Sequence, residues 1–304
     1  MIRAHHLTKR FGTLTAVEDV SFEIERGRIA GFLGPNGAGK TTTMRMLCGV
    51  LSPSEGSATI GGIDVATDPR AAHAILGWLP DGAPACDELR VVEYLRFRAG
   101  LFGGIARSRI SQVVSECGLS EVPRRLVGQL SRGYRQRLAL AAALIHDPGV
   151  LILDEPATGL DPVQQRVFRG LLRELAENRA ILFSTHQLGE AAEVCDDLLL
   201  IGNGRLLASG SVQSLRAETG GGGLTIEVRG IDPAAVLGAI PGVRSTSILP
   251  GDAPWTRVRC EVEGDVREAI FAAVAQAGGS LRQLAVDEHS LDQWVRSVLT
   301  SGTA

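Results

Sequence analysis

Nine consecutive residues near the N-terminal end have the types and the spacing of a phosphate-binding loop. They read G-P-N-G-A-G-K-T-T and match the pattern G-x-x-x-x-G-K-[ST]. Glycines let such a backbone curl until its N–H groups point at phosphate oxygens. We expect Lys40 to reach the β- and γ-phosphates of a nucleotide and the Thr41 hydroxyl to be a ligand of Mg²⁺. The other residues expected to contact phosphate are Gly34, Asn36, Gly37, Ala38, Gly39 and Thr42.

The segments on either side of this loop have the patterns that it requires. Residues 28–33 are a short, mostly apolar run suited to a buried parallel strand, and residues 41–49 read as a helix. The N-terminus of that helix would add a partial positive charge next to the phosphates. The alternative interpretation is an ordinary glycine-rich turn between a strand and a helix.

Two acidic side chains follow a second apolar run. Residues 150–153 read V-L-I-L, which is typical of a parallel strand covered on both faces, and Asp154 and Glu155 come next. A carboxylate at a strand end beside a phosphate loop can hold Mg²⁺, and a second can polarise the attacking water. We assign Asp154 to the metal and Glu155 to the water. Taken alone, the same pair could be a solvated turn.

Three more side chains are candidates for nucleotide contacts. The apolar run 180–184 leads to His186, which could donate a hydrogen bond to a phosphate oxygen. The run 75–79 leads to Asp81, a further candidate metal ligand at the sheet edge where α/β proteins bind ligands. Phe11, in an early turn, could stack on a purine. Two of them have a structural alternative: His186 could be a structural histidine, and Phe11 could be a turn residue that fills a small hydrophobic gap.

The remaining patterns predict an α/β fold with a mixed central sheet. Residues 2–33 alternate as strands separated by turns, which indicates a mostly antiparallel N-terminal layer. No convincing core strand occurs at about 82–147, where a helical subdomain is expected. Its helices are predicted at 91–102, 108–117 and 132–145. This arrangement corresponds to a phosphate-loop NTPase domain.

Four consecutive glycines at 220–223 indicate a flexible hinge. We therefore predict a domain at 1–218, a linker at 219–223 and a second domain at 224–304. The second domain has the order β-α-β-β-α-β of a small α+β ferredoxin-like fold and is interpreted as a binding or regulatory module. Its predicted strands are 224–229, 243–249, 256–262 and 281–286, and its helices are 233–240, 266–277 and a closing helix at 291–299.

The composition narrows the possible partners. The chain has 304 residues, 44% hydrophobic and 21% charged, and a net charge of −3 with dispersed basic residues, so we expect no nucleic acid. Its apolar runs are far shorter than the roughly 20 residues that span a bilayer, so we expect a cytoplasmic chain that meets a membrane only through a partner. The five cysteines lack metal-site spacing and are expected to be reduced core thiols.

Residues 1 to about 218 resemble an ATP-binding cassette subunit. Residues 130–137, L-S-R-G-Y-R-Q-R, are similar to the signature LSGGQ-x-Q-R of that family. The resemblance implies ATP and Mg²⁺ as ligands and a head-to-tail homodimer, in which Ser131 and Gly133 of one subunit contact the γ-phosphate held by the other. It also implies that Asp161 ends a dimer-interface loop. His186 matches the family's switch histidine, and Phe11 matches its adenine-stacking aromatic residue.

The sequence departs from the family pattern at two places. Arg132 and Tyr134 stand where the signature commonly has Gly and Gln, and Asp81 stands where the family has Gln. A signature with a basic residue at this position is similar to the signatures of exporter cassettes of the gliding-motility and multidrug-resistance type. We therefore expect an ATP-hydrolysing exporter subunit, bound to the inner face of the membrane through a separate permease, with catalysis by Lys40, Glu155 and His186. The alternatives are a soluble cassette acting on ribosomes or DNA, and a binding-only regulator.

Overall fold

A computed structural model describes residues 1–82, 85–218, 223–286, 295 and 298–299. The chain divides into two compact units, Met1–Ser209 and a second that begins at Gly210. The predicted domain boundary at residue 218 lies beyond this division and stays a prediction. The difference consists mainly of helix α8 (Val212–Glu218), which the sequence analysis did not predict.

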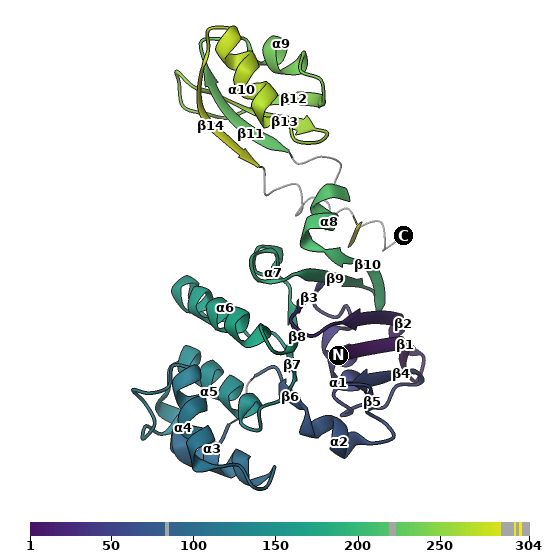
Figure 1. Ribbon diagram of the computed structural model, residues 1–304. Helices are drawn as coiled ribbons and strands as arrows, with labels where there is room; N and C mark the ends of the chain where they lie inside the picture. The colour runs from purple at the N-terminus through teal and green to yellow at the C-terminus, as the bar shows by residue number, and fades with distance from the viewer. Residues whose placement is uncertain (83–84, 219–222, 287–294, 296–297, 300–304) are drawn as a thin grey trace. The chain divides into compact units, whose positions relative to one another are not determined.

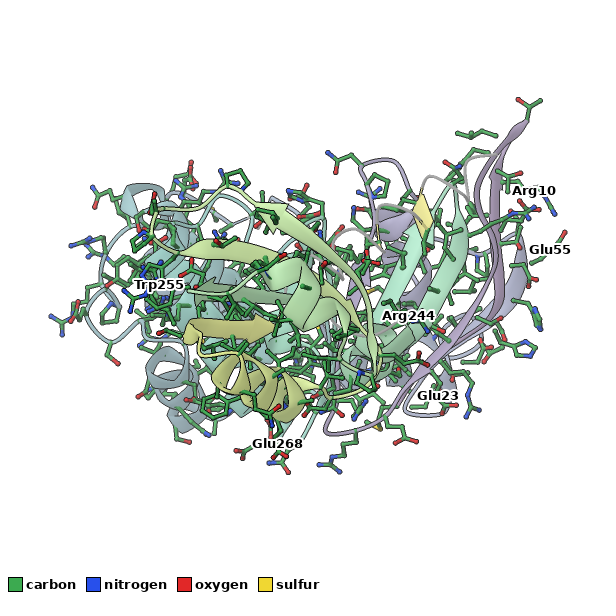
Figure 2. All side chains as sticks on the ribbon, turned by 90° about the horizontal axis from the view of Figure 1, so that it is seen from above. Arg10, Glu23, Glu55, Arg244, Trp255 and Glu268 are labelled. Carbon is green, nitrogen blue, oxygen red and sulfur yellow. The ribbon has the colours of Figure 1, made fainter. Side chains whose placement is uncertain are left out.

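An antiparallel sheet forms the N-terminal layer of the first unit, as predicted. Its order is β2-β1-β4-β5, with β1 (Ile2–Phe11), β2 (Leu14–Ile24), β4 (Glu55–Ile60) and β5 (Ile63–Asp64). The inner faces of these strands are apolar and buried, with Ile2, Leu7 and Ile60 fully inaccessible. The outer face is charged, and Arg10 of β1 forms an ion pair with Glu55 of β4, both labelled in Figure 2.

The second sheet carries the chemistry-bearing strand ends. Its order is β10-β9-β3-β8-β7-β6, with β3 (Ile29–Leu33), β6 (Leu76–Leu79), β7 (Val150–Leu153), β8 (Ala180–Thr185), β9 (Asp197–Gly202) and β10 (Arg205–Ser211). Strands β3, β6, β7, β8 and β9 run parallel, and every residue of β3, β7 and β8 is buried. Because Leu33 pairs with Thr185 and Leu79 with Leu153, the predicted polar strand ends share one edge.

Helices cover the central sheet. They are α1 (Lys40–Leu47), α2 (Pro69–Ala74), α6 (Pro162–Ala176) and α7 (Leu188–Val194). Figure 1 shows α3 (Val91–Gly100), α4 (Arg107–Glu116) and α5 (Arg132–Leu144) grouped together next to β6, which confirms the helical subdomain. Throughout the described residues, no helix combines the length and the hydropathy that crossing a bilayer demands.

The second unit has the predicted ferredoxin-like order. It contains β11 (Leu224–Arg229), α9 (Pro233–Gly238), β12 (Val243–Leu249), β13 (Thr256–Val262), α10 (Arg267–Gln276) and β14 (Ser280–Val286). The sheet order is β12-β13-β11-β14 with antiparallel neighbours. Ile226, Val258 and Ile270 pack in its core. The predicted closing helix at 291–299 and the linker at 219–223 fall largely outside the described residues.

The cysteines are free, and all but one are buried. The buried thiols are Cys48, Cys117, Cys195 and Cys260, and Cys86 is exposed. Burial raises the pKa of the Cys117 thiol to about 12, which keeps it protonated at neutral pH. The buried cysteines therefore behave as small core side chains, whereas the prediction of a core thiol is wrong for Cys86.

Candidate functional site

The loop between β3 and α1 forms an open cradle of backbone amides. Gly39 has a φ of 105°, and a β-carbon there would lie 2.8 Å from the carbonyl oxygen of Ala16, so only glycine fits. Within the described part of the chain, five amides of this loop and of the helix start lack a hydrogen-bond partner: those of Gly37, Gly39, Lys40, Thr41 and Thr42. Unpaired N–H groups at a helix N-terminus are an anion site, so the cradle fits a phosphate group.

Lys40 places a buried cation in this cradle. Its side chain is 6% exposed, and its Nζ donates to the carbonyl oxygens of Gly34 at 2.7 Å and Pro35 at 3.1 Å. The same Nζ lies 3.7 Å from Oε1 of Glu155. A desolvated ammonium beside the free amides is the arrangement expected for binding a triphosphate.

Asp154 and Glu155 are tied to β8 through one serine hydroxyl. Ser184 Oγ accepts a hydrogen bond from the backbone N–H of Glu155 at 2.8 Å and donates to Oδ1 of Asp154 at 2.6 Å. Asp154 is 2% exposed, and Glu155 has a φ of 47°, a conformation uncommon for a residue other than glycine. This arrangement turns the two successive carboxylates in different directions at the end of β7.

Three side chains surround the Glu155 carboxylate. Thr158 Oγ1 donates to Oε2 at 2.8 Å, and His186 Nδ1 lies 3.1 Å from Oε2 and 3.3 Å from Oε1. Lys40 approaches from the third side. Since a carboxylate accepts, the His186 tautomer that fits carries its proton on Nδ1. Glu155 is thereby held at the centre of the site, 15% exposed.

These groups line a cavity of about 370 Å³ at the sheet edge. Its lining is Ala16, Asn36, Gly37, Gly39, Lys40, Thr41, Thr42, Asp81, Glu155, Thr158 and His186. The structure thus brings together nine of the residues that the sequence analysis selected. Ala16 and Thr158 were missed, although Thr158 follows Glu155 by three residues in the same loop.

Other predicted residues lie elsewhere or behind the cavity. Within the described residues its lining includes none of Phe11, Gly34, Ala38, Asp154, Ser131, Gly133 and Asp161. Phe11 is 49% exposed, with Lys9 Nζ 5.2 Å from the ring centroid. Ser131 and Asp161 are N-caps, accepting from the amides of Tyr134 at 3.4 Å and Gln164 at 2.9 Å, respectively.

A divalent cation would depend on the nucleotide for most of its ligands. Among the described residues, no cluster of three or more His, Cys, Asp or Glu side chains could hold a metal ion. Thr41 and Asp81, whose side chains carry oxygen donors, do line the cavity. This donor set fits Mg²⁺, which commonly takes one or two protein oxygens together with phosphates and water.

Glu190 forms a supporting contact behind His186 that the sequence analysis missed. Its Oε2 accepts from Thr185 Oγ1 at 2.6 Å, and Thr185 Oγ1 also accepts from the N–H of Gln187 at 3.1 Å. Burial is the largest cause of a raised pKa of the Glu190 carboxyl, and the charge of Glu155 adds to it. The turn that carries His186 is therefore fixed by side-chain hydrogen bonds.

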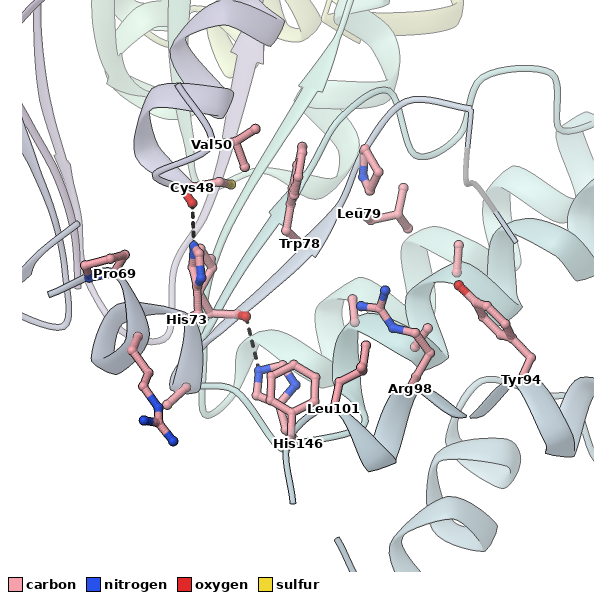
Figure 3. A pocket seen from close by; sticks show the side chains of 18 residues that line it. Cys48, Val50, Pro69, His73, Trp78, Leu79, Tyr94, Arg98, Leu101 and His146 are labelled. Atoms are coloured by element: carbon pink, nitrogen blue, oxygen red, sulfur yellow. Dashed lines mark hydrogen bonds between the residues drawn. The ribbon is translucent and has the colours of Figure 1, made fainter. Parts of the chain in front are cut away.

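A larger, mostly apolar cavity of about 940 Å³ adjoins the same strand ends (Figure 3). Trp78, Tyr94 and Phe102 are among its lining residues. Leu79 and Pro80 line it as well, whereas the next residue, Asp81, lines the smaller cavity. The end of β6 therefore connects the two.

His146 packs in this larger cavity. Its ring stacks on Phe102, with centroids 3.8 Å apart and planes at 9°. Its Nε2 lies 3.1 Å from the carbonyl oxygen of Leu76, while Nδ1 is buried and unpaired in the described structure. Burial lowers the pKa of His146 to about 4, so the ring is neutral near pH 7.

Comparison with known proteins agrees with this site. The ABC transporter family model matches residues 17–158. The chain is 38% identical over 251 residues to the Nod factor export ATP-binding protein I of Burkholderia orbicola (strain AU 1054), covering 81% of this chain and 82% of that protein. It is 37% identical over 222 residues to the probable multidrug ABC transporter ATP-binding protein YbhF of Escherichia coli (strain K12).

The match to YbhF covers 72% of this chain but only 38% of the length of that relative. A solved structure of the ATP-binding subunit of an ABC transporter superposes with a TM-score of 0.66 at 28% identity. The superposition covers 72% of this chain and 93% of the chain in that structure. With an amide cradle, a buried lysine and a strand-end glutamate in one cavity, these similarities show that the chain belongs to the ABC transporter family, whose nucleotide-binding cassette it carries.

Proposed function

We propose that this chain binds and hydrolyses ATP with Mg²⁺ and drives export through a separate membrane subunit. The observation that carries the proposal is that one cavity brings together unpaired amides of the phosphate loop, Lys40 Nζ and the Glu155 carboxylate. Cation and amides face a carboxylate, which is the combination that phosphoryl transfer to water needs. Relatives named for multidrug transport and Nod factor export support an exporter.

In this proposal the chain positions the nucleotide and the attacking water, and it supplies the positive charge that faces the phosphates. Bound ATP with Mg²⁺ would supply the transferable phosphoryl group and the metal charge. Lys40 and the amides would hold the phosphates, and Thr41, Asp81 and Asp154 are the residues that would hold the metal; Asp154 lies outside the cavity lining. Glu155 accepts a hydrogen bond from the attacking water, and His186 holds Glu155 until a γ-phosphate competes for the same imidazole N–H. Phe11 stacks on the adenine.

The signature residues act in trans in this proposal. The lining of the nucleotide cavity lacks Ser131, Gly133 and Asp161 among the described residues, so in this proposal they contact the nucleotide of a second copy. We propose a head-to-tail homodimer, in which the N-terminus of α5, capped by Ser131, meets the γ-phosphate held by the partner. Gel filtration with ATP tests this assembly.

The proposed membrane subunit would dock at the larger cavity. Its lining includes the solvent-accessible side chains of Val50, Leu101 and Phe102, exposed by 55%, 64% and 36%. An apolar helix from a membrane protein would cover them, and Asp81 at the end of β6 would sense its position. Co-purification of the chain from membranes identifies this subunit. Leu101→Glu should abolish its recovery, whereas equal recovery in the ribosomal fraction would favour the alternative function.

Glu155→Gln distinguishes an ATPase from a binding-only regulator. We expect the variant to bind ATP with unchanged affinity and to lose turnover, because an amide cannot accept the proton of the attacking water. For the second domain we propose a regulatory role in dimerisation or in coupling to the membrane subunit, with simple stabilisation of the chain as the alternative.

A further inference from the structure

The N-terminus of α5 makes two contacts within the same chain to the segment that follows Glu155, one in the loop after β7 and one in the first turn of α6. A β-carbon at Gly159 would lie 2.2 Å from Cζ of Arg132, so the guanidinium rests directly on the Gly159 backbone. Likewise, a β-carbon at Gly133 would lie 2.6 Å from Oε1 of Gln164, in the first turn of α6. Consecutive residues of the helical subdomain therefore contact the loop between β7 and α6, through Arg132, and the start of α6, through Gly133.

This loop is the one that orients Glu155. Thr158, which donates to Oε2 of Glu155 at 2.8 Å, immediately precedes Gly159. The loop is closed by two backbone hydrogen bonds, from Thr158 N–H to Glu155 O at 3.2 Å and from Leu160 N–H to Ala157 O at 3.1 Å. A displacement of Gly159 would therefore change the position of the Thr158 hydroxyl.

No hydrogen bond or ion pair among the described residues explains why Arg132 lies against Gly159. Within the described residues its guanidinium makes no hydrogen bond and no ion pair, although it is exposed and could reach into solvent. It stands at the first position of α5, where a cation is disfavoured by the partial positive charge of the helix N-terminus. Packing against the Gly159 backbone is therefore what holds this side chain in place.

We infer that Arg132 is a positioning residue, which acts through Gly159 and Thr158 to hold Glu155 in the orientation required for hydrolysis. The inference rests on the proposed function and deepens it, because it links the helical subdomain to the water-activating carboxylate of the same chain. A planar guanidinium can lie flat on a peptide, whereas a lysine ammonium is a flexible point charge. The shape of Arg132, rather than its charge, carries this role.

The first test measures hydrogen exchange of the Thr158 and Leu160 amides in the full chain. In Arg132→Ala and in Arg132→Lys we expect these amides to exchange about tenfold faster, because the loop opens more readily. Arg107→Ala is the matched control, since Arg107 is also exposed at the first position of a helix, α4, and should leave the exchange unchanged. Unchanged exchange in Arg132→Ala, or full protection in Arg132→Lys, overturns the inference whether or not the chain hydrolyses ATP.

The second test is a double-mutant cycle on hydrolysis. Arg132→Ala should lower kcat about tenfold with KM for ATP within about twofold of wild type. Gly159→Ala forces the guanidinium away and adds strain at a φ of 74°, so it should lower kcat as well. Its effect should be several-fold smaller in the Arg132→Ala background, because the clash is then absent. Additive effects overturn the inference, while an inactive wild-type chain would reject the proposed function and leave the exchange experiment decisive.

Discussion

His186 Nδ1 lies 3.1 Å from Oε2 of Glu155, the same oxygen that accepts the hydrogen bond of Thr158. This carboxylate is therefore oriented by residues that follow two neighbouring parallel strands, β7 and β8. The contact gives the histidine a function that does not require a nucleotide, because it fixes the glutamate in the free protein. We expect the imidazole N–H to exchange this oxygen for a phosphate oxygen when ATP binds.

Lys40→Ala should weaken ATP binding by about a hundredfold or more, because a desolvated triphosphate loses its nearest cation. Titration with a fluorescent ATP analogue measures the dissociation constant. Arg3→Ala removes an exposed cation that forms an ion pair with Glu23 in the N-terminal sheet, and serves as the control. Equal affinity of Lys40→Ala and wild type would disprove the phosphate-loop assignment.

Thr158→Val should reduce kcat about tenfold and leave ATP affinity unchanged. The isosteric side chain keeps the packing but removes the 2.8 Å hydrogen bond that orients Glu155. Steady-state hydrolysis at several ATP concentrations separates kcat from KM. Thr158→Ser retains the hydroxyl and should keep most of the activity, so a serine variant as slow as the valine variant would contradict this role.

His146 should make stability fall with acidity between about pH 6.5 and pH 4. Its pKa is about 4 in the folded chain, below the ordinary 6.5, so the unfolded chain binds more protons across this window and acid favours unfolding. Above pH 6.5 His146 is neutral in both the folded and the unfolded chain, so it does not lower the stability there. In His146→Gln, whose amide can still donate to Leu76 O, the thermal midpoint should depend less on pH over that window. An unchanged pH profile would show that other groups control acid stability.

A chain ending at Glu218 should still fold and bind ATP, because the proposed nucleotide contacts precede the linker. Under the regulatory hypothesis, its dimerisation or its stimulation by the membrane subunit should change. Calorimetry, nucleotide titration and partner-stimulated ATPase assays compare it with the full chain. A lower thermal midpoint with unaltered affinity, dimerisation and stimulation would leave stabilisation as the role of the second domain.

Much of the fold could be predicted because its signals are local. The buried runs that became β3, β7 and β8 are short, continuous and followed by polar residues, so both the strands and their shared edge were predictable. The ferredoxin-like unit was predictable from alternation and turn residues alone. Helices α6 and α7 were overlooked, although Asp161 and the following proline are an ordinary helix start.

The supporting contacts of the site could not be predicted in the same way. Ser184 and Glu190 carry no motif and matter only because the register of β7 and β8 brings one to Asp154 and the position of α7 brings the other to Thr185. The contact between Arg132 and Gly159 joins residues that are distant in sequence and depends on how α5 packs. Tertiary placement, which a single sequence does not encode in any local pattern, decides these interactions.

The most direct test of the central proposal is to measure both the ATP hydrolysis rate and the ATP affinity of Glu155→Gln and to compare them with wild type. We predict a turnover lower by at least about a hundredfold at unchanged affinity, since Glu155 acts on water and Lys40 and the amides bind the phosphates. Gel filtration with ATP and Mg²⁺ should then show a trapped dimer. Hydrolysis at the wild-type rate would contradict the account and move the catalytic role to another residue.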